Sequence, residues 1–280
     1  MSPAVSMTDP LQQVLEQVKQ ESNNEDLTGL TAGDIRRLAT DMWTWASAVP
    51  PDRQDARILI EPEGEAGPLP RAILEAAGPD MPFLVDSLLA ECAAAGHEVK
   101  TLFHPIVKLD DGQCVSVIQI HLPLVTDAEA RRLVQEVRKT LSSVREVVRD
   151  FEPMKARMQA EIDGIAQLKT LAYDDTRETI AFLEWLLEEH FVFLGCREYH
   201  FETDANGRVL PEEPIMVDGS NLGILRDEQL NVLSRDSEPL VLTPEISDLL
   251  AEPFPMFVAK STGGSNATIS ASRNMMRTGR

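Results

Sequence analysis

The sequence is poor in basic residues, and this shortage argues against some classes of partner. Twenty-six lysine and arginine residues stand against 46 aspartate and glutamate residues, so the formal net charge is −20. A surface of that sign repels phosphate groups, and we therefore expect neither nucleic acid nor an anionic membrane as a partner. The charge is typical of a solubilising surface and identifies no partner by itself.

Cysteine, aromatic residues and long apolar runs are also scarce. Aromatic residues make up 5% of the chain, and the three cysteines, Cys92, Cys114 and Cys196, lie far apart with no Cys-x-x-Cys pair. Neither a disulfide framework nor a zinc knuckle is indicated, and a reducing compartment fits. The first residues lack the basic start and apolar core of a signal peptide. No run approaches the roughly 20 apolar residues that cross a bilayer. We expect a soluble cytoplasmic protein.

Several sequence motifs of catalysis and cofactor binding are missing. No Gly-x-Gly-x-x-Gly follows a strand, and neither a phosphate-binding Gly-x-x-x-x-Gly-Lys motif nor a Gly-x-Ser-x-Gly elbow occurs. His97, His104 and His121 do not have the helical spacing of a His-Glu-x-x-His metal site, and no carboxylate stands at a recognisable ligand spacing. We therefore predict no catalytic, cofactor-binding or metal-binding residue in this chain.

The clearest structural signals begin at residue 71. Residues 71–77 form an apolar run typical of a buried strand, and Gly78-Pro79-Asp80 ends it with turn residues. Asp80 is a natural helix N-cap, and Pro82 suits a first helical turn. A helical apolar stripe follows, with Val85, Leu88, Leu89 and Cys92 as its members, and Gly96 ends the helix.

The next segments complete a regular order of elements. Residues 99–109 and 114–124 read as two strands joined at Asp110-Asp111-Gly112. Thr126 and Glu129 have the spacing of a capping box that opens a second helix. Residues 145–151 read as a last strand. The predicted order is β-α-β-β-α-β, which is the ferredoxin-like arrangement.

Elements are also predicted on both sides of this unit. Before it we expect helices over residues 9–20 and 31–48 and a short strand over 57–60 that adds to the edge of the sheet. After it we expect two helices over residues 152–173 and 175–190. A strand over residues 191–201 follows, and strict alternation would place its aromatic side chains on one face. These are Phe191, Phe193, Tyr199 and Phe201.

Several phrases of the sequence, in order and spacing, resemble one family. They are DMPFLVDS at 80–87, His104-Pro105, FVFLGCREY at 191–199, LGILR at 222–226 and AKST at 259–262. The chain resembles the N-terminal region of the large bacterial NAD-specific glutamate dehydrogenases. In that family the region contains ACT and PAS-like regulatory modules ahead of a distant dehydrogenase domain. The strand, turn and helix around Asp80 also resemble an ACT domain, a small module that often senses amino acids.

The expected fold class is therefore α+β, with a ferredoxin-like, ACT-like unit and a partial PAS-like module. The expected division is a helical segment at 1–52, an ACT-like domain at 53–152, a helical connector at 153–190, a second α/β module at 191–262 and an irregular tail at 263–280. The tail follows the end of the resemblance near Thr262, has no acidic residue and shows no helical or strand period. It fits either a natural flexible tail or a truncated or frameshifted copy that stops before the catalytic domain.

The resemblance implies a regulatory and oligomerisation segment of an NAD-dependent glutamate dehydrogenase, which converts glutamate and NAD to 2-oxoglutarate, ammonia and NADH. On this hypothesis the chain holds no NAD, is inactive alone and self-associates through its ACT-like sheets or helices. The alternative is a stand-alone ACT-like sensor that binds an amino acid and a partner protein. A third hypothesis is a small enzyme with an unrecognised site.

The best candidate for a ligand site is the turn that opens the helix after residue 77. Backbone N–H groups at a helix N-terminus can hold a carboxylate, and the helix dipole favours an anion there. The resemblance implies an amino-acid effector at the turn, formed by Gly78, Asp80, Met81, Pro82, Phe83 and Leu84. The usual ACT pattern has glycine where this chain has Phe83. The structural alternative is that Phe83 and Leu84 fill the core and Asp80 only caps the helix.

Overall fold

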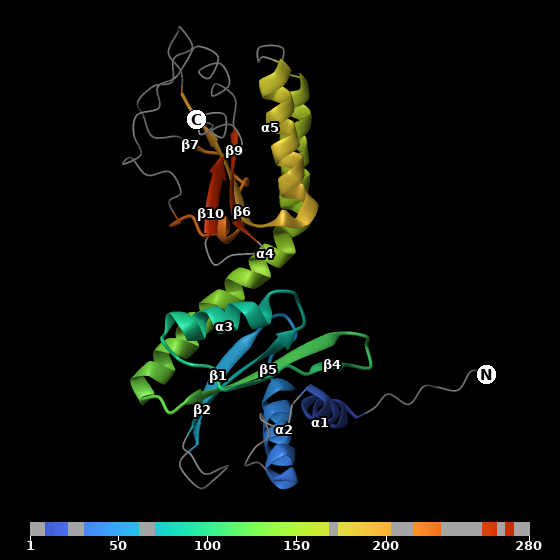
Figure 1. Ribbon diagram of the computed structural model, residues 1–280, viewed down its shortest axis with the longest axis vertical. Coiled ribbons are helices and arrows are strands. Elements are labelled where there is room, and N and C mark those ends of the chain that lie inside the picture. Colours follow the sequence, from blue (N-terminus) through green and yellow to red (C-terminus); the bar gives the residue numbers. More distant parts are fainter. Residues whose placement is uncertain are drawn as a thin grey trace, which may run out of the picture. The chain divides into compact units, whose positions relative to one another are not determined.

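The chain forms two compact units, Met1–Arg145 and Glu146–Arg280 (Figure 1). The computed structural model describes residues 9–21, 31–61, 71–167, 173–202, 215–230, 254–261 and 267–271. Both units combine helices with an antiparallel sheet, so the predicted α+β class is confirmed. No helix of the described residues is long and apolar enough to cross a membrane.

The first unit is a sheet with helices on both faces (Figure 1). Its strands pair in the order β1-β2-β5-β3, and β4 also pairs with β5. Strands β2 and β5 are neighbours, as expected for the runs at 71–77 and 114–124. The strands are β1 (Asp55–Glu61), β2 (Arg71–Pro79), β3 (Thr101–Phe103), β4 (Ile106–Lys108) and β5 (Cys114–Pro123). The helices are α1 (Pro10–Glu21), α2 (Ala32–Ala46), α3 (Leu84–Ala94) and the start of α4 (Asp127–Gln167).

The outer strand of the sheet differs from the prediction. Residues 145–151 are helical, within α4, so the strand predicted there is wrong. The place beside β2 is taken by β1, which pairs with it antiparallel; this confirms the edge strand predicted at 57–60. From β1 onward the order is therefore β-β-α-β-β-β-α, and the outer strand precedes the other strands of its sheet. The capping box opens α4, because the Thr126 N–H donates to Glu129 Oε2 at 2.8 Å. The helix then continues through Pro153.

The two faces of the sheet follow the alternation of side chains along the strands. Ala56, Ile58 and Ile60 of β1 lie on the face covered by α4. Residues of the opposite parity meet α1 and α2, because Ala77 and Val117 share a core with Met42. Helices therefore cover both faces of β2, which explains why the strand is buried along almost its whole length.

The β4 edge of the sheet is covered by two glutamines of α1. Gln17 Nε2 donates to the Ile106 carbonyl, and the Ile106 N–H donates to Gln17 Oε1, both at 2.8 Å. One helical turn earlier, Gln13 repeats the pair with Lys108, at 3.1 Å and 3.0 Å. The two side-chain amides bond the backbone as a neighbouring strand would, so they satisfy groups that an open edge leaves exposed.

The second unit places a sheet beside two helices. The unit begins with the remaining part of α4, which is followed by α5 (Tyr173–Trp185). A π-helical turn (Leu186–His190) then leads into β6 (Phe191–His200). Its strands pair in the order β10-β9-β6-β7, and β8 also pairs with β6. The remaining elements are β7 (Ile215–Met216), β8 (Leu222–Gly223), a 3₁₀ turn (Ile224–Arg226), β9 (Phe254–Ser261) and β10 (Ala267–Ala271). The irregular tail predicted at 263–280 is therefore wrong at β10; its other residues lie outside the described part.

A β-bulge changes the expected faces of β6. The pairing with β9 shifts between Phe193 and Gly195, so Leu194 is an extra residue. The bulge reverses the alternation: Phe193 and Cys196 share the core with α4 and α5, whereas Tyr199 lies with Arg197. The prediction that Phe193 and Tyr199 share one face is wrong because alternation cannot continue through a bulge.

Candidate functional site

The predicted effector turn has an unusual backbone at Phe83. Phe83 has φ 71° and ψ 3°, and it is the one non-glycine residue with positive φ in the described part of the chain. It is also the N-cap of α3, without a side-chain cap hydrogen bond, and the residue is 41% exposed. Left-handed backbone of this kind suits glycine, the residue that the usual ACT pattern has here.

Asp80 does not have the expected role. The helix starts at Leu84, so Asp80 is not its N-cap and Pro82 lies before its first turn. Asp80 instead continues the sheet, since its N–H donates to the Cys114 carbonyl at 2.9 Å. Leu84 is buried, as the structural alternative expected, but Phe83 is not. The turn displays an aromatic ring to solvent instead of filling the core with it.

The turn is anchored from the segment before β1. Gln54 Nε2 donates to the Pro79 carbonyl at 3.0 Å and lies 3.6 Å from Met81 Sδ. Gly78 has φ 152°, and a Cβ there would come within 2.6 Å of the Arg53 carbonyl oxygen. The glycine is thus explained by this close approach. The first backbone N–H groups of α3 have no side-chain cap, and they can donate hydrogen bonds to a carboxylate.

A row of polar side chains crosses the face of the first sheet under α2. Arg57, Glu75 and Gln119 are direct cross-strand partners on β1, β2 and β5. Fully buried Glu75 accepts from Arg57 Nε at 2.5 Å and from Gln119 Nε2 at 2.8 Å. The Arg57 guanidinium also lies 4.8 Å from the ring centre of Trp45. Each polar group has a partner, so the row fixes the register of three strands.

The histidines do not gather into one site. His121 is buried on β5, 3.0 Å from Gln119 Oε1, whereas His104 lies 2.7 Å from Ser116 Oγ. Burial, and then the charge of Arg71, lower the pKa of His121 to about 3, so it is neutral at ordinary pH. In the described part of the chain no group of three histidine, cysteine, aspartate or glutamate residues could hold a metal.

In the second unit, Asp150 joins α4 to the LGILR segment. Its carboxylate accepts from the Gly223 N–H at 2.8 Å and from Arg226 Nε at 2.5 Å. Burial acts to raise the pKa of Asp150, but the hydrogen bonds from Arg226, Gly223 and Arg149 outweigh it and lower the pKa to about 2. Gly223 has φ 59°, and a Cβ there would lie 2.1 Å from the Leu194 carbonyl oxygen, so glycine is required.

Arg197 fixes the residues that follow the LGILR segment. Its side chain is buried and donates to the carbonyls of Leu225, Asp227 and Leu230 at 2.6, 2.9 and 2.8 Å. Its Nε donates to Asn221 Oδ1 at 2.7 Å. These contacts order the segment after β8 against β6. They are structural bonds within the protein and leave little of the guanidinium free to bind a ligand.

Sequence reasoning did not single out these networks. A charge inside the apolar run at 71–77 was the one visible signal for Glu75, since buried carboxylates need partners. Asp150 could not be assigned its role while residues 145–151 were predicted to be a strand. Arg197 had no local signal, because its partners are backbone carbonyls about thirty residues away.

The elements of the first unit are arranged as in an ACT-like domain. An antiparallel sheet is present, and helix α3 follows its central strand β2. Residues 14–136 match the family model described as "Glutamate dehydrogenase, ACT1 domain", which includes β1 and most of the two N-terminal helices. The chain is 27% identical over 227 residues to the NAD-specific glutamate dehydrogenase of Halomonas elongata, covering 73% of this chain and 14% of that protein. The enzyme of that name from Pseudomonas aeruginosa is 28% identical over 205 residues, 65% of this chain and 13% of that protein.

These comparisons confirm the resemblance stated from the sequence. The chain matches the ACT1 region of NAD-specific glutamate dehydrogenases, and it spans about one seventh of the length of these two relatives.

Proposed function

We propose that this chain is the regulatory and oligomerisation segment of an NAD-dependent glutamate dehydrogenase that converts glutamate to 2-oxoglutarate and ammonia. The observation that supports the proposal is the match of residues 14–136 to the ACT1 domain, in a chain without a dinucleotide-binding motif. The NAD site and the catalytic groups would lie in other parts of the enzyme. The second unit would be the PAS-like module that the resemblance implies.

The DNA beyond codon 280, read in all frames, tests this proposal. A reading frame for a dehydrogenase directly downstream would support it. Unrelated genes there would favour a stand-alone sensor instead. The purified chain should also reduce no NAD in the presence of glutamate. Turnover that scales with the concentration of this chain, in a preparation free of full-length enzyme, would contradict the proposal that the catalytic groups lie in other parts of the enzyme.

We propose the turn before α3 as the site of an amino-acid effector. The ligand carboxylate would lie on the uncapped amides that begin at Leu84, and the exposed Phe83 ring would stack on the ligand side chain. Calorimetry with a panel of amino acids tests this proposal. Saturable heat that Phe83→Gly changes would support it, whereas no heat with either protein would contradict it.

We also propose that the chain self-associates through its helices. The β4 edge of the first sheet is closed by Gln13 and Gln17, so it is unsuited to sheet extension. The exposed aromatic side chains of α5, Phe182 and Trp185, are 38% and 40% accessible and lie against one another. Light scattering should show an oligomer that Phe182→Glu dissociates. A monomer at every concentration would contradict this proposal.

A further inference from the structure

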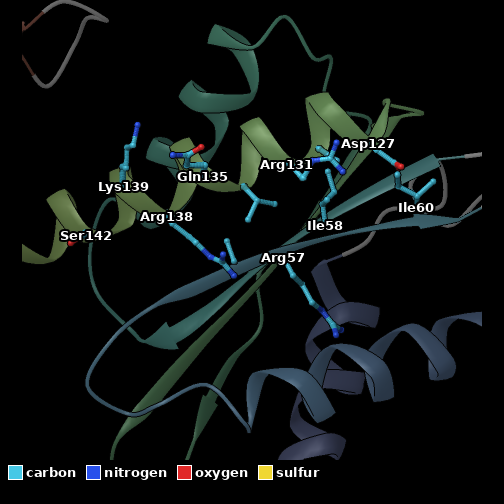
Figure 2. A pocket seen from close by; sticks show the side chains of 12 residues that line it. Arg57, Ile58, Ile60, Asp127, Arg131, Gln135, Arg138, Lys139 and Ser142 are labelled. Carbon is cyan, nitrogen blue, oxygen red and sulfur yellow. The ribbon is translucent and has the colours of Figure 1, made fainter.

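A groove of about 770 Å³ lies between edge strand β1 and helix α4 of the first unit (Figure 2). Its floor is apolar and is formed by Ala56, Ile58 and Ile60 of β1 with Ala130 and Val134 of α4. Ile60 is 40% exposed. Figure 2 shows Arg57 directed away from the groove, on the side of the sheet that faces α2, so Arg57 lines the groove with its backbone.

Basic side chains line the helix side of this groove. Arg131 and Arg138 stand along it, whereas Figure 2 shows the Lys139 side chain directed away from the sheet; Asp127 is the one acidic lining residue. Among the lining residues on α4, positive charges therefore outnumber negative ones, in a chain with a net charge of −20. Arg138 pairs with Asp55 at 2.6 Å and Lys139 with Glu136 at 3.1 Å, and these pairs are exposed and weak. Arg131 has no ion pair with the described part of the chain.

The two edges of the first sheet differ in whether their backbone groups have hydrogen-bond partners. The β4 edge is closed by the Gln13 and Gln17 amides, whereas no strand of the described residues pairs with the outer side of β1. At one end of β1 the Ala56 N–H donates to Asp55 Oδ1 at 2.7 Å. Alternate backbone groups farther along such an edge are directed outward and can pair with an extended peptide.

We propose that β1 and α4 form a docking groove for an extended acidic segment of a partner protein, which adds to the sheet beside β1. The segment would run antiparallel to β1, with alternate side chains over the groove. An apolar side chain would lie on Ile58 and Val134, with an acidic residue two positions before and two after it. Such acidic residues are about 13 Å apart in a strand, and Arg131 and Arg138, two helical turns apart, are separated by about 10 Å.

A second copy of this chain fits the groove less well than an acidic peptide. In antiparallel pairing, the β1 of a second copy would present Ala56, Ile58 and Ile60 on the groove face, with no acidic residue for the α4 cations. It would also bring a second set of those cations close to the first, and like charges at short range are unfavourable. Charge complementarity therefore favours an acidic partner.

The test is fluorescence anisotropy with the intact chain and a labelled peptide of pattern Glu-Thr-Val-Thr-Glu flanked by Gly-Ser. We expect saturable binding that Arg131→Glu weakens about tenfold, because one charge contact becomes repulsive. Arg132→Glu is the matched control, since it makes the same charge change on the same helix but lies outside the groove lining; it should change affinity less than about twofold. A reordered peptide, Glu-Glu-Val-Thr-Thr, should bind weakly.

Backbone methylation separates strand addition from other modes of binding. Methyl groups on the peptide nitrogens that face β1 should abolish binding, whereas methyl groups on the alternate nitrogens should not. The proposal is overturned if the reordered peptide binds equally, if Arg132→Glu weakens binding as much as Arg131→Glu, or if no saturable binding occurs. A dimer of the chain that Ile60→Asp dissociates would assign this edge to a second copy and would also overturn it.

Discussion

Asp150 and Arg226 are 76 residues apart in the sequence, and their side chains form two hydrogen bonds, of 2.5 Å and 3.0 Å. The pKa of Asp150 is lowered to about 2 in the folded protein, below its usual value near 4. The carboxylate therefore stabilises the second unit fully above pH 4, and this stability is lost as the pH falls through about 2. Denaturant titrations from pH 6 to 2 should show a loss of roughly 2 kcal/mol that Asp150→Asn removes. An equal loss in the variant would contradict the assignment.

The first unit should respond to acid at a higher pH. His121 has its pKa lowered to about 3 by burial and by Arg71, against about 6.5 in an unfolded chain. Protonation therefore favours unfolding, and stability is lost as the pH falls from 6.5 towards 3, by up to about 1.4 kcal/mol per pH unit. Hydrogen exchange of β5 amides measures this loss, and His121→Gln should flatten it between pH 6 and 4. Unchanged pH dependence in the variant would show that other groups are responsible.

Replacing Phe83 with glycine should change stability little. The left-handed backbone at Phe83 costs about 1 kcal/mol for a non-glycine residue, and glycine removes this strain. Two effects oppose this gain: the loss of the ring contacts of a residue that is 41% exposed, and the greater freedom of glycine in the unfolded chain. We expect a net change within about 1 kcal/mol in urea unfolding, whereas a fully buried ring would cost about 3 kcal/mol or more. Phe103→Ala, which removes a buried ring, provides that comparison.

Removing the Gln13 and Gln17 side chains should expose the backbone groups of the β4 edge. In Gln13→Ala/Gln17→Ala the backbone groups of Ile106 and Lys108 lose their partners and become available to another chain. We expect concentration-dependent association by light scattering beyond that of the parent chain. Gln12→Ala/Glu16→Ala removes an exposed pair on the same helix and should have no such effect. Association of both variants alike would show that α1 stability, and not edge closure, is the cause.

The three cysteines should differ sharply in reactivity. Burial raises the pKa of the Cys92 thiol to about 11 and of the Cys196 thiol to about 12, whereas Cys114 is exposed. Since the thiolate is the reactive form, a thiol reagent at pH 8 should modify Cys114 alone in the folded protein and all three cysteines in denaturant. Mass spectrometry of the labelled peptides checks this. Rapid native labelling of Cys196 would contradict the buried position of β6.

Local signals in the sequence predicted the elements but not all of their partners. The strand at 71–77, the capping box at Thr126 and the edge strand at 57–60 were predicted because turn residues and caps mark their ends. Residues 145–151 were assigned wrongly because a short run rich in valine fits a strand as well as a helix. The helix is distinguished from the strand only by the fact that α4 continues through Pro153, because no residue before 151 ends the helix.

The candidate sites were less predictable than the fold. The turn at residues 78–84 was identified from its glycine, proline and aspartate residues, but the positive φ of Phe83 depends on the path of β2 into α3. The groove residues are distant in sequence, on β1 and α4, and they meet only because β1 is the outer strand beside β2. The bulge at Leu194 likewise depends on the partner strand β9.

The place of β1 ahead of the other strands of its sheet has a consequence for synthesis. A ribosome releases the chain from its N-terminus, so β1 has emerged before its partner β2, and all five strands of this sheet have emerged by Pro123. Nothing from the second unit is needed to complete the sheet. An outer strand encoded after α4 would leave the flank of β2 open until much later. The observed order therefore shortens the time for which a nascent, apolar strand is exposed to other chains.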